Sequence, residues 1–365
     1  MTKLDLNKNN YVAIMAGGIG SRFWPMSRTG FPKQFLDILN SGRTLIQGTF
    51  DRFKKFIPAE NIYVVTSDSY KEIVHKQLPG LPIENILSEP SRKNTAPCIA
   101  YISYKLHQLN PDANLICAPA DHLISDEESF TQLCTDALHF TANIKALVTL
   151  GIKPTNPNTG YGYIQYEQFA VSDNVYQVKT FTEKPDKELA KTFVASGDFL
   201  WNAGIFVWEA RNIIKAFEKL LPEMHEVFDF EKANFNTPNE TEAIERIYPQ
   251  CINISIDYGI MEKAENVYVI PSSFGWSDLG TWASAYETLD KDYLGNAVAG
   301  NNVMIIDATN NMVHADNKKL VVLQGLEDFV VVDTKDVLLI CRKDKEQEIK
   351  NYVAEIKRNK GDKFL

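Results

Sequence analysis

The sequence lacks several features that would place it in a class of protein at once. Among its 365 residues, no apolar run reaches the ~20 residues that a helix needs to cross a bilayer. The first ten residues are polar, so we expect no signal peptide. Positive charge is not in excess either, because 47 acidic residues outnumber 38 Lys and Arg to give a net charge of −9. This balance argues against a dedicated nucleic-acid binder, and we expect a cytoplasmic protein with neither nucleic acid nor membrane as a partner.

Cysteine and histidine patterns typical of structural metal sites are also missing. The five cysteines are odd in number and include no C-x-x-C pair, so we expect buried thiols instead of a disulfide framework or a zinc site. The six histidines form no H-E-x-x-H motif. We interpret His122 as a packed or hydrogen-bonded neighbour of Asp121 instead of a metal ligand.

What the sequence does contain is an alternation of strand and helix patterns over its first 152 residues. This alternation predicts an α/β fold, a Rossmann-like and mostly parallel sheet flanked by helices, whose ligands bind at the carboxyl ends of the strands. The expected strands are 11–15, 62–67, 114–121 and 146–152, and the expected helices are 44–56, 70–78, 94–109 and 129–144.

The pattern changes twice further along the chain. From about residue 160 a pair of strands, 161–167 and 175–185, precedes a helix at 187–196 and a strand at 202–210, which we interpret as an elaboration of the sheet. After residue 293, five short apolar runs begin at 303, 312, 320, 329 and 337, eight or nine residues apart. This spacing fits a meander or a short β-helix-like coil and does not choose between them. The tail, 343–358, is predicted to be an amphipathic helix.

A basic, glycine-rich loop, "AGGIGSRFWPMSRTGFPKQF" at residues 16–35, follows the first predicted strand. Glycines let the backbone N–H groups approach a phosphate, and Arg22 and Lys33 would add charge. The loop is no P-loop, and Gly17, Gly18 and Gly20 are too closely spaced for the dinucleotide fingerprint. It could be an ordinary strand-to-helix turn, but the cations in an acidic chain favour a polyphosphate site.

Four further segments carry candidate site residues. Asp121 ends a predicted strand and Asp278 lies in "GWSDLGTW"; both suit Mg²⁺, or each could simply cap the helix that follows, which for Asp278 would start at Leu279. Glu183 and Lys184 in "FTEKPD" could hold a sugar phosphate or form a surface turn. In "FLWNAGIF" an amide lies between aromatic residues that could stack on a sugar or belong to the core.

Together these segments resemble the sugar-phosphate nucleotidyltransferases, and in particular the mannose-1-phosphate guanylyltransferases. The resemblance rests on seven motifs in family order: "GGIGSRFWPMSRTGFPKQF", "EPSRKNTAPCI", "PADH", "TGYGYI", "FTEKP", "WNAGIF" and "GWSDLGTW". It implies the nucleotide-diphospho-sugar transferase fold, with a catalytic domain at residues 1–290 and a small, β-rich, β-helix-like domain at residues 291–365. It further implies that the enzyme joins GTP to mannose 1-phosphate, releases pyrophosphate and requires Mg²⁺ for GDP-mannose biosynthesis.

The resemblance also assigns roles to residues. Arg22 would pair with the leaving pyrophosphate and Lys33 would hold the α-phosphate, which makes both catalytic. The other residues implied to bind the nucleotide are Ala16, Gly17, Gly18, Gly20, Ser21, Glu89, Asn94 and Thr95, the last three in the guanine pocket. The residues implied to bind the sugar phosphate are Tyr161, Gly162, Glu183, Lys184, Asn202 and Gly204, and those implied to bind the metal are Asp121 and Asp278.

Three alternatives remain open at this point. The chain could be a guanylyltransferase for another sugar, such as a manno-heptose 1-phosphate, or a non-catalytic paralogue that senses GDP-mannose. Glycines and alternating strands alone would also fit a dinucleotide-binding oxidoreductase, although that leaves "EKP" and "WNAGIF" without a role. Some relatives carry a fused cupin isomerase domain, which we do not expect in a chain that ends at Leu365. The oligomeric state is open, with a homodimer as the assembly to test.

Overall fold

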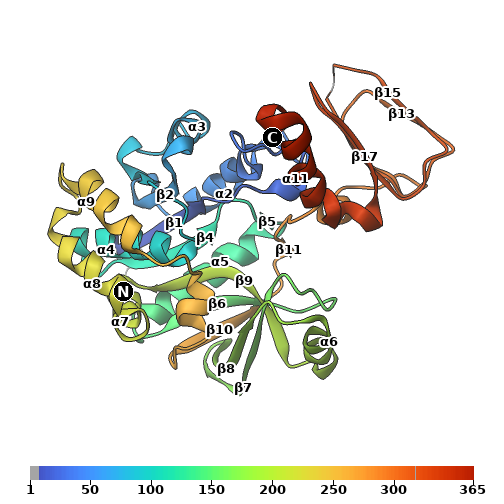
Figure 1. The fold of residues 1–365 in the computed structure, drawn as a ribbon. Coiled ribbons are helices and arrows are strands. Elements are labelled where there is room, and N and C mark those ends of the chain that lie inside the picture. Colours follow the sequence, from blue (N-terminus) through green and yellow to red (C-terminus); the bar gives the residue numbers. More distant parts are fainter. Residues whose placement is uncertain (1–7, 317) are drawn as a thin grey trace. The chain divides into compact units, whose positions relative to one another are not determined.

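The fold was described from a computed structural model, which covers residues 8–316 and 318–365 (Figure 1). The described residues form two compact units. The first contains the chain up to Gly17, then Phe50–Pro119 and Ile124–Trp276. The second contains Gly18–Thr49, Ala120–Leu123 and Ser277–Leu365. The chain passes between the units within helix α2 (Leu45–Lys54), near the short strands β5 (Leu123–Ile124) and β11 (Trp276–Ser277), and at Gly17.

A nine-stranded sheet in the order β3-β2-β1-β4-β9-β6-β10-β8-β7 forms the centre of the first unit. The strands β1 to β4 pair in parallel, as do β6 and β10, which confirms the predicted parallel arrangement. β9 runs antiparallel between β4 and β6, and β7 and β8 form the predicted hairpin, so the sheet is mixed at this end. The strands are β1 (Asn10–Ala16), β2 (Ile62–Ser67), β3 (Ile86–Glu89), β4 (Asn114–Pro119), β6 (Leu147–Ile152), β7 (Gly162–Ser172), β8 (Val175–Glu183), β9 (Phe199–Glu209) and β10 (Val267–Ser272).

Helices cover both faces of this sheet, which is why its central strands are continuously apolar. One face packs Tyr11 and Ala13 of β1 in a cluster with α4, α7 and α8. The buried side of α5 packs on β4 and β6 without joining that cluster, which places α5 on the opposite face. The helices of this unit are α3 (Lys71–Gln77), α4 (Thr95–Leu109), α5 (Glu127–Thr141), α6 (Lys187–Ser196), α7 (Ala210–Leu220), α8 (Pro222–Glu231), α9 (Glu240–Ile247) and a π-helical turn η8 (Asp257–Met261).

The C-terminal strands of the second unit form a coil. Three pairs of strands that stand two apart in the chain run parallel: β12 with β14, β14 with β16, and β13 with β15. In a meander, strands that follow one another in the chain pair antiparallel. Among the described strands of this coil only β16 and β17 pair in this way. The strand pairing therefore favours the β-helix-like coil over the meander. The strands are β12 (Ala297–Ala299), β13 (Val303–Ile306), β14 (Met312–Ala315), β15 (Val321–Gln324), β16 (Phe329–Asp333) and β17 (Leu338–Arg342).

Short helices complete the second unit. The predicted tail helix begins as a 3-10 helix, η9 (Lys343–Glu348), and continues as α11 (Ile349–Lys360). The glycine-rich loop forms η1 (Ser21–Phe23) and η2 (Lys33–Phe35), and α10 (Trp282–Thr288) precedes the coil. A shared apolar cluster joins Phe23, Trp24 and Trp282 to coil residues such as Met312 and to Ile349 of α11. The glycine-rich loop is therefore packed on the C-terminal coil.

The expectation about the cysteines can be checked directly. All five cysteines are free and buried, as predicted. Within residues 8–316 and 318–365, we find no helix with the length and apolar character that a bilayer crossing requires.

Candidate active site

The glycine-rich loop is held in shape by its own contacts. Gly20 has a left-handed backbone (φ 63°), and a Cβ at this position would lie 2.3 Å from the Cβ of Lys33. Only glycine fits such a close approach. The side-chain amide of Gln34 donates to the carbonyl of Gly18 at 3.0 Å and closes the loop on itself.

Lys33 belongs to the second unit and is only 4% exposed. Its ammonium pairs with Asp121 Oδ2 at 3.0 Å and donates to the carbonyl oxygens of Asp278 and Leu279, both at 2.7 Å. A lysine ammonium has three N–H donors, so all three are engaged within the protein. Lys33 thus joins the two candidate metal ligands, although 245 residues separate it from Asp278.

The charge of Lys33 sets the ionisation of Asp121. Burial alone would raise the pKa of the Asp121 carboxyl, but the charge of Lys33, with a contribution from His122 and the Lys33 hydrogen bond, holds that pKa below its ordinary value. Asp121 is therefore a carboxylate at neutral pH. Whether His122 binds a metal stays a prediction.

The helix-capping alternatives for the two aspartates are wrong. Helix α10 starts at Trp282 and its N-cap is Thr281, not Asp278. Helix α5 is capped by Asp126, not by Asp121. Asp278 instead accepts from the backbone N–H of Gly280 at 3.0 Å in a tight loop. Neither aspartate therefore caps a helix.

The donor set around Lys33 fits a magnesium ion. Mg²⁺ is usually held by one or two protein carboxylates, with substrate phosphates and water as the other ligands. Asp121 and Asp278 meet that requirement, because Lys33 ties both of their segments to one point. Within the described part of the chain no group of three or more His, Cys, Asp or Glu side chains suits a metal.

Arg22, on η1, has a buried Nε atom with no hydrogen-bond partner among the described residues. A buried donor without a partner costs free energy, about 1–3 kcal/mol for an ordinary polar group. Such an atom in a guanidinium suits an anionic ligand, because guanidinium groups bind phosphate oxygens through paired N–H donors.

In the first unit, Glu89 ends β3 and is 7% exposed. It accepts a hydrogen bond from the Tyr248 hydroxyl at 2.9 Å, and a Cβ on Gly17 would lie 3.6 Å from its other oxygen. Burial raises the pKa of Glu89 to about 7, against the opposing effect of the Tyr248 hydrogen bond. Sequence reasoning missed Tyr248, which lies 159 residues further along in a segment without a motif.

The other predicted nucleotide-binding residues of this unit make structural hydrogen bonds. Asn94 has a left-handed backbone (φ 69°) and its side chain accepts from the N–H of Thr95 at the start of α4. The Thr95 hydroxyl accepts from the backbone N–H of Ile256 at 2.9 Å. Ala16 is buried, and its carbonyl accepts from Thr66 at 2.8 Å. Their contact with a nucleotide stays a prediction.

The six predicted sugar-binding residues lie in β7, β8 and β9 or directly next to them in the chain. Gly162 at the start of β7 is paired with Glu183 at the end of β8, and a Cβ on Gly162 would lie 2.5 Å from Glu183 Oε2. Glu183 is 8% exposed and forms an ion pair with Lys184. Tyr161 packs edge-on against Trp201, with ring centres 5.0 Å apart.

Asn202 has its amide orientation fixed by the surrounding bonds. Its oxygen accepts from the Thr149 hydroxyl at 2.8 Å and from the N–H of Gly204 at 3.1 Å. Its Nδ2 donates to Asp257 at 2.9 Å, so at most one N–H remains for a ligand.

Asp257 and its neighbours were not predicted from the sequence. Asp257 begins the π-helical turn η8, a distortion that is frequent at functional sites. Burial, with the nearby charge of Glu183, raises the pKa of Asp257 to about 7, although Lys184 opposes this. Glu262 just after the turn accepts from the backbone N–H of Glu183 at 2.7 Å. The closely spaced charged residues of "IDYGIMEK" were the feature of the sequence that could have pointed to Asp257.

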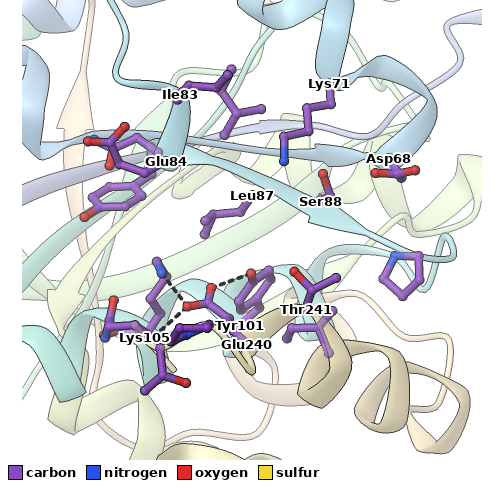
Figure 2. A pocket seen from close by; sticks show the side chains of 18 of the residues that line it. Asp68, Lys71, Ile83, Glu84, Leu87, Ser88, Tyr101, Lys105, Glu240 and Thr241 are labelled. Atoms are coloured by element: carbon purple, nitrogen blue, oxygen red, sulfur yellow. Dashed lines mark hydrogen bonds and ion pairs between the residues drawn. The ribbon is translucent and has the colours of Figure 1, made fainter. Parts of the chain in front are cut away.

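A separate groove of about 990 Å³ runs along β3 (Figure 2). The Glu240 carboxylate that lines this groove already has hydrogen-bond partners, because Tyr101 and Lys105 each donate to it at 2.6 Å. None of the residues predicted to bind nucleotide, sugar or metal lines this groove. We therefore assign no substrate to it.

Comparison with known proteins decides the family. The nucleotidyl transferase family matches residues 11–293. The chain belongs to the nucleotidyl transferase family. A second match, to the MannoseP isomerase/GMP-like beta-helix domain, covers residues 300–356 and agrees with the observed coil. The chain is therefore a nucleotidyltransferase with a C-terminal β-rich domain.

Individual relatives show which members of the family this chain is similar to. A mannose-1-phosphate guanylyltransferase of Escherichia coli K12 is 36% identical over 95% of this chain and 73% of its own length. The alginate biosynthesis protein AlgA of Pseudomonas putida is 38% identical over 93% of this chain and 70% of its own length. The crystal structure of a Thermus thermophilus protein described as a mannose-1-phosphate geranyltransferase superposes with a TM-score of 0.86 at 29% identity, covering 96% of this chain and 99% of that one.

Proposed function

We propose that this nucleotidyltransferase transfers GMP from GTP to α-D-mannose 1-phosphate, giving GDP-mannose and pyrophosphate. The observation that carries the proposal is the level of identity to relatives named mannose-1-phosphate guanylyltransferase, 35–37% over more than nine-tenths of the chain. The ordered carboxylates and cations described above supply the chemistry that this reaction needs.

The reaction requires no covalent enzyme intermediate. A phosphate oxygen of the sugar phosphate attacks the α-phosphorus of GTP, and the bond to the bridging oxygen of the pyrophosphate breaks. Two anions must therefore be brought into line while their charge is offset. Arg22, with its unpartnered Nε, would pair with the departing pyrophosphate. Lys33 would reach the α-phosphate by exchanging one of its two carbonyl contacts for a phosphate oxygen.

Asp121 and Asp278 would hold Mg²⁺, which when bound would neutralise part of the phosphate charge. Lys33 keeps Asp121 ionised and both segments in place. The backbone of Gly17, Gly18, Gly20 and Ser21 would surround the phosphates of GTP.

Glu89 is the residue that we propose recognises the guanine base. As a carboxylate it would accept from the N1–H and the exocyclic amine of guanine, and adenine offers no such pair of donors. A site built for these bonds can reject a base that lacks them by up to ~10⁴-fold. Glu183, Lys184 and Asn202 would hold the sugar phosphate, with Asp257 orienting the amide of Asn202.

The proposal also covers the domain boundaries, the cellular location and the oligomeric state. Residues 1–290 would form the catalytic domain and 291–365 the β-helix-like domain, in keeping with the two family matches. The acidic composition supports a cytoplasmic enzyme with no nucleic-acid or membrane partner. Light scattering of the purified protein would test whether it is a homodimer.

Pyrophosphate release tests the function. We expect release only when GTP, mannose 1-phosphate and Mg²⁺ are all present, with each omitted in turn as a control. Replacing GTP by ATP should abolish most of the signal, and equal turnover with both would exclude Glu89 as a guanine reader. A panel of sugar 1-phosphates that includes a manno-heptose tests the sugar, and a higher kcat/KM for another member would reassign the substrate.

A further inference from the structure

Tyr248 is a fully buried tyrosine whose hydroxyl donates to the side chain of Glu89. It begins the 3-10 turn η7 (Tyr248–Gln250) and packs in the apolar cluster that contains α4. A few residues further on, the carbonyl of Ile254 accepts from the backbone N–H of Ala96 at 3.1 Å. The segment that carries Tyr248 is therefore anchored to the first turn of α4, and a buried phenol hydroxyl keeps the partner that it has.

The two oxygens of the Glu89 carboxyl have different surroundings. Oε1 accepts from the Tyr248 hydroxyl at 2.9 Å, and among the described residues this is the one hydrogen bond to the Glu89 side chain. Oε2 lies beside Gly17, where a Cβ would be 3.6 Å away. Because Gly17 has no side chain, Oε2 is left on the side of the glycine-rich loop.

The proton on Glu89 decides which base its carboxyl can match. An ionised carboxylate only accepts hydrogen bonds, which suits the two adjacent donors of guanine, the N1–H and the exocyclic amine. A protonated carboxyl offers one donor and one acceptor, which suits adenine, whose N1 accepts and whose exocyclic amine donates. A hydrogen bond donated to the ionised form favours ionisation. The Tyr248 hydroxyl therefore favours the form of Glu89 that matches guanine.

We propose that Tyr248 is a positioning residue for base selection, whose hydroxyl orients the Glu89 carboxylate and favours its ionised form, so that the site takes GTP over ATP. This inference rests on the proposed recognition of guanine by Glu89. In this arrangement Tyr248 holds Oε1 from the side of the apolar cluster, and Oε2 faces the nucleotide beside Gly17. Tyr248 itself does not touch the base.

Near neutral pH, Glu89 is the group of this cluster that titrates. Burial raises the pKa of Glu89 to about 7, and among the described residues the Tyr248 hydroxyl opposes this change. The other titratable groups that face Glu89 belong to η7 and α4. Burial, followed by the charge of Glu89, raises the pKa of Tyr248 and of the Cys98 thiol. Burial, with smaller contributions that include the charge of Glu89, raises the pKa of Tyr101. These three groups therefore stay neutral between about pH 6 and about pH 8.

The experiment measures binding of GTP and of ATP to the full chain, with Mg²⁺ and without a sugar phosphate. Isothermal titration calorimetry follows both affinities from about pH 6 to about pH 8.5. The triphosphate is the same in the two nucleotides, so its own titration cancels in the ratio of the affinities. The variants are Tyr248→Phe, Glu89→Gln and the control Tyr104→Phe. Tyr104 is buried in the same cluster and its hydroxyl bonds to His225, so the control removes the same group away from Glu89.

In Tyr248→Phe the ratio of GTP affinity to ATP affinity should fall about tenfold at about pH 7, and the pH profile of the ratio should move up by about one pH unit, because a hydrogen bond to a charged group is lost. At about pH 8.5 the GTP affinity should return close to the wild-type value, which a loss of structure would not produce. Glu89→Gln has the donor and acceptor of a protonated carboxyl, so its ratio should be low at every pH. Tyr104→Phe should match wild type.

Wild type alone provides a second measurement, in which the ratio should rise at least about tenfold from about pH 6 to about pH 8. A flat wild-type profile, an unchanged ratio in Tyr248→Phe, or an equal loss in Tyr104→Phe would overturn the proposal. If Glu89→Gln loses the ratio and Tyr248→Phe does not, the recognition of guanine by Glu89 stands and the role of Tyr248 falls. If neither variant changes the ratio, that recognition falls as well. Because no sugar is present, a wrong choice of mannose 1-phosphate as substrate would alter none of these results.

Discussion

Replacing Lys33 by Met should destabilise the fold as well as slow the reaction. The substitution keeps the length of the side chain but leaves Asp121 without its 3.0 Å partner and removes the donor from two carbonyl groups. Breaking a buried ion pair costs ~3–5 kcal/mol. Asp121 is 28% exposed, so water replaces part of that interaction, and the two carbonyl groups lose ~1 kcal/mol each. We expect a total loss of about 3 kcal/mol in the free energy of unfolding.

The assay is thermal unfolding of the ligand-free proteins at neutral pH, followed by circular dichroism. Lys33→Met should unfold at the lowest temperature. The double variant Lys33→Met, Asp121→Asn should recover about 1 kcal/mol, because it no longer leaves a charge without a partner. The pKa of Asp121 is lowered in the folded state, so the ion pair contributes above the unfolded pKa of about 4 and is lost as the pH falls through the folded value. The gap between wild type and Lys33→Met should therefore close in acid. A Lys33→Met protein as stable as wild type, or a double variant no better than the single one, would refute this reasoning.

Three further predictions concern the proposed substrates. Since the pKa of Glu89 is about 7, KM for GTP should fall about tenfold between about pH 6 and about pH 8 as the carboxyl ionises, and Glu89→Gln should remove this dependence. Steady-state kinetics of Lys184→Ala should show a KM for mannose 1-phosphate that is at least ~10-fold higher with KM for GTP unchanged; an effect on GTP alone would mean that the sugar site is misassigned. Asp278→Asn should unfold like wild type, because Thr281 and not Asp278 caps α10, while kcat falls ~10²–10³-fold; full activity would remove Asp278 from the metal site.

Local patterns predicted many elements of the fold, although α8, α9 and β10 were not predicted. The apolar run at 62–67 became β2, the pair 161–167 and 175–185 became the β7–β8 hairpin, and the helical spacing at 94–109 became α4. The C-terminal repeat predicted strands, but strand spacing is the same in a meander and in a coil. Only the parallel pairing of β12 with β14 and of β13 with β15 separates the two.

The candidate site could be predicted less completely from the sequence, because it depends on contacts between residues that are distant in the chain. Lys33 and Asp278 each stand in a recognisable motif, yet nothing in either motif shows that the ammonium of one binds the backbone of the other. Tyr248 bonds to Glu89 from a segment that has no motif of its own. Asp257 was overlooked because a π-helical turn has no sequence period by which to find it.

The packing of the glycine-rich loop on the C-terminal coil has a consequence for how the protein is made. The indole N–H of Trp24 donates to the carbonyl of Phe364 at 2.8 Å, across 340 residues of sequence. At a synthesis rate of ~5–20 residues per second, the loop therefore waits roughly 20–70 seconds on the ribosome before its packing partners exist. During that time Arg22 of η1 cannot yet be held by the packing seen in the complete second unit. A polypeptide released before these residues are made would lack the packing partners of the loop, so we expect it to lose its phosphate chemistry.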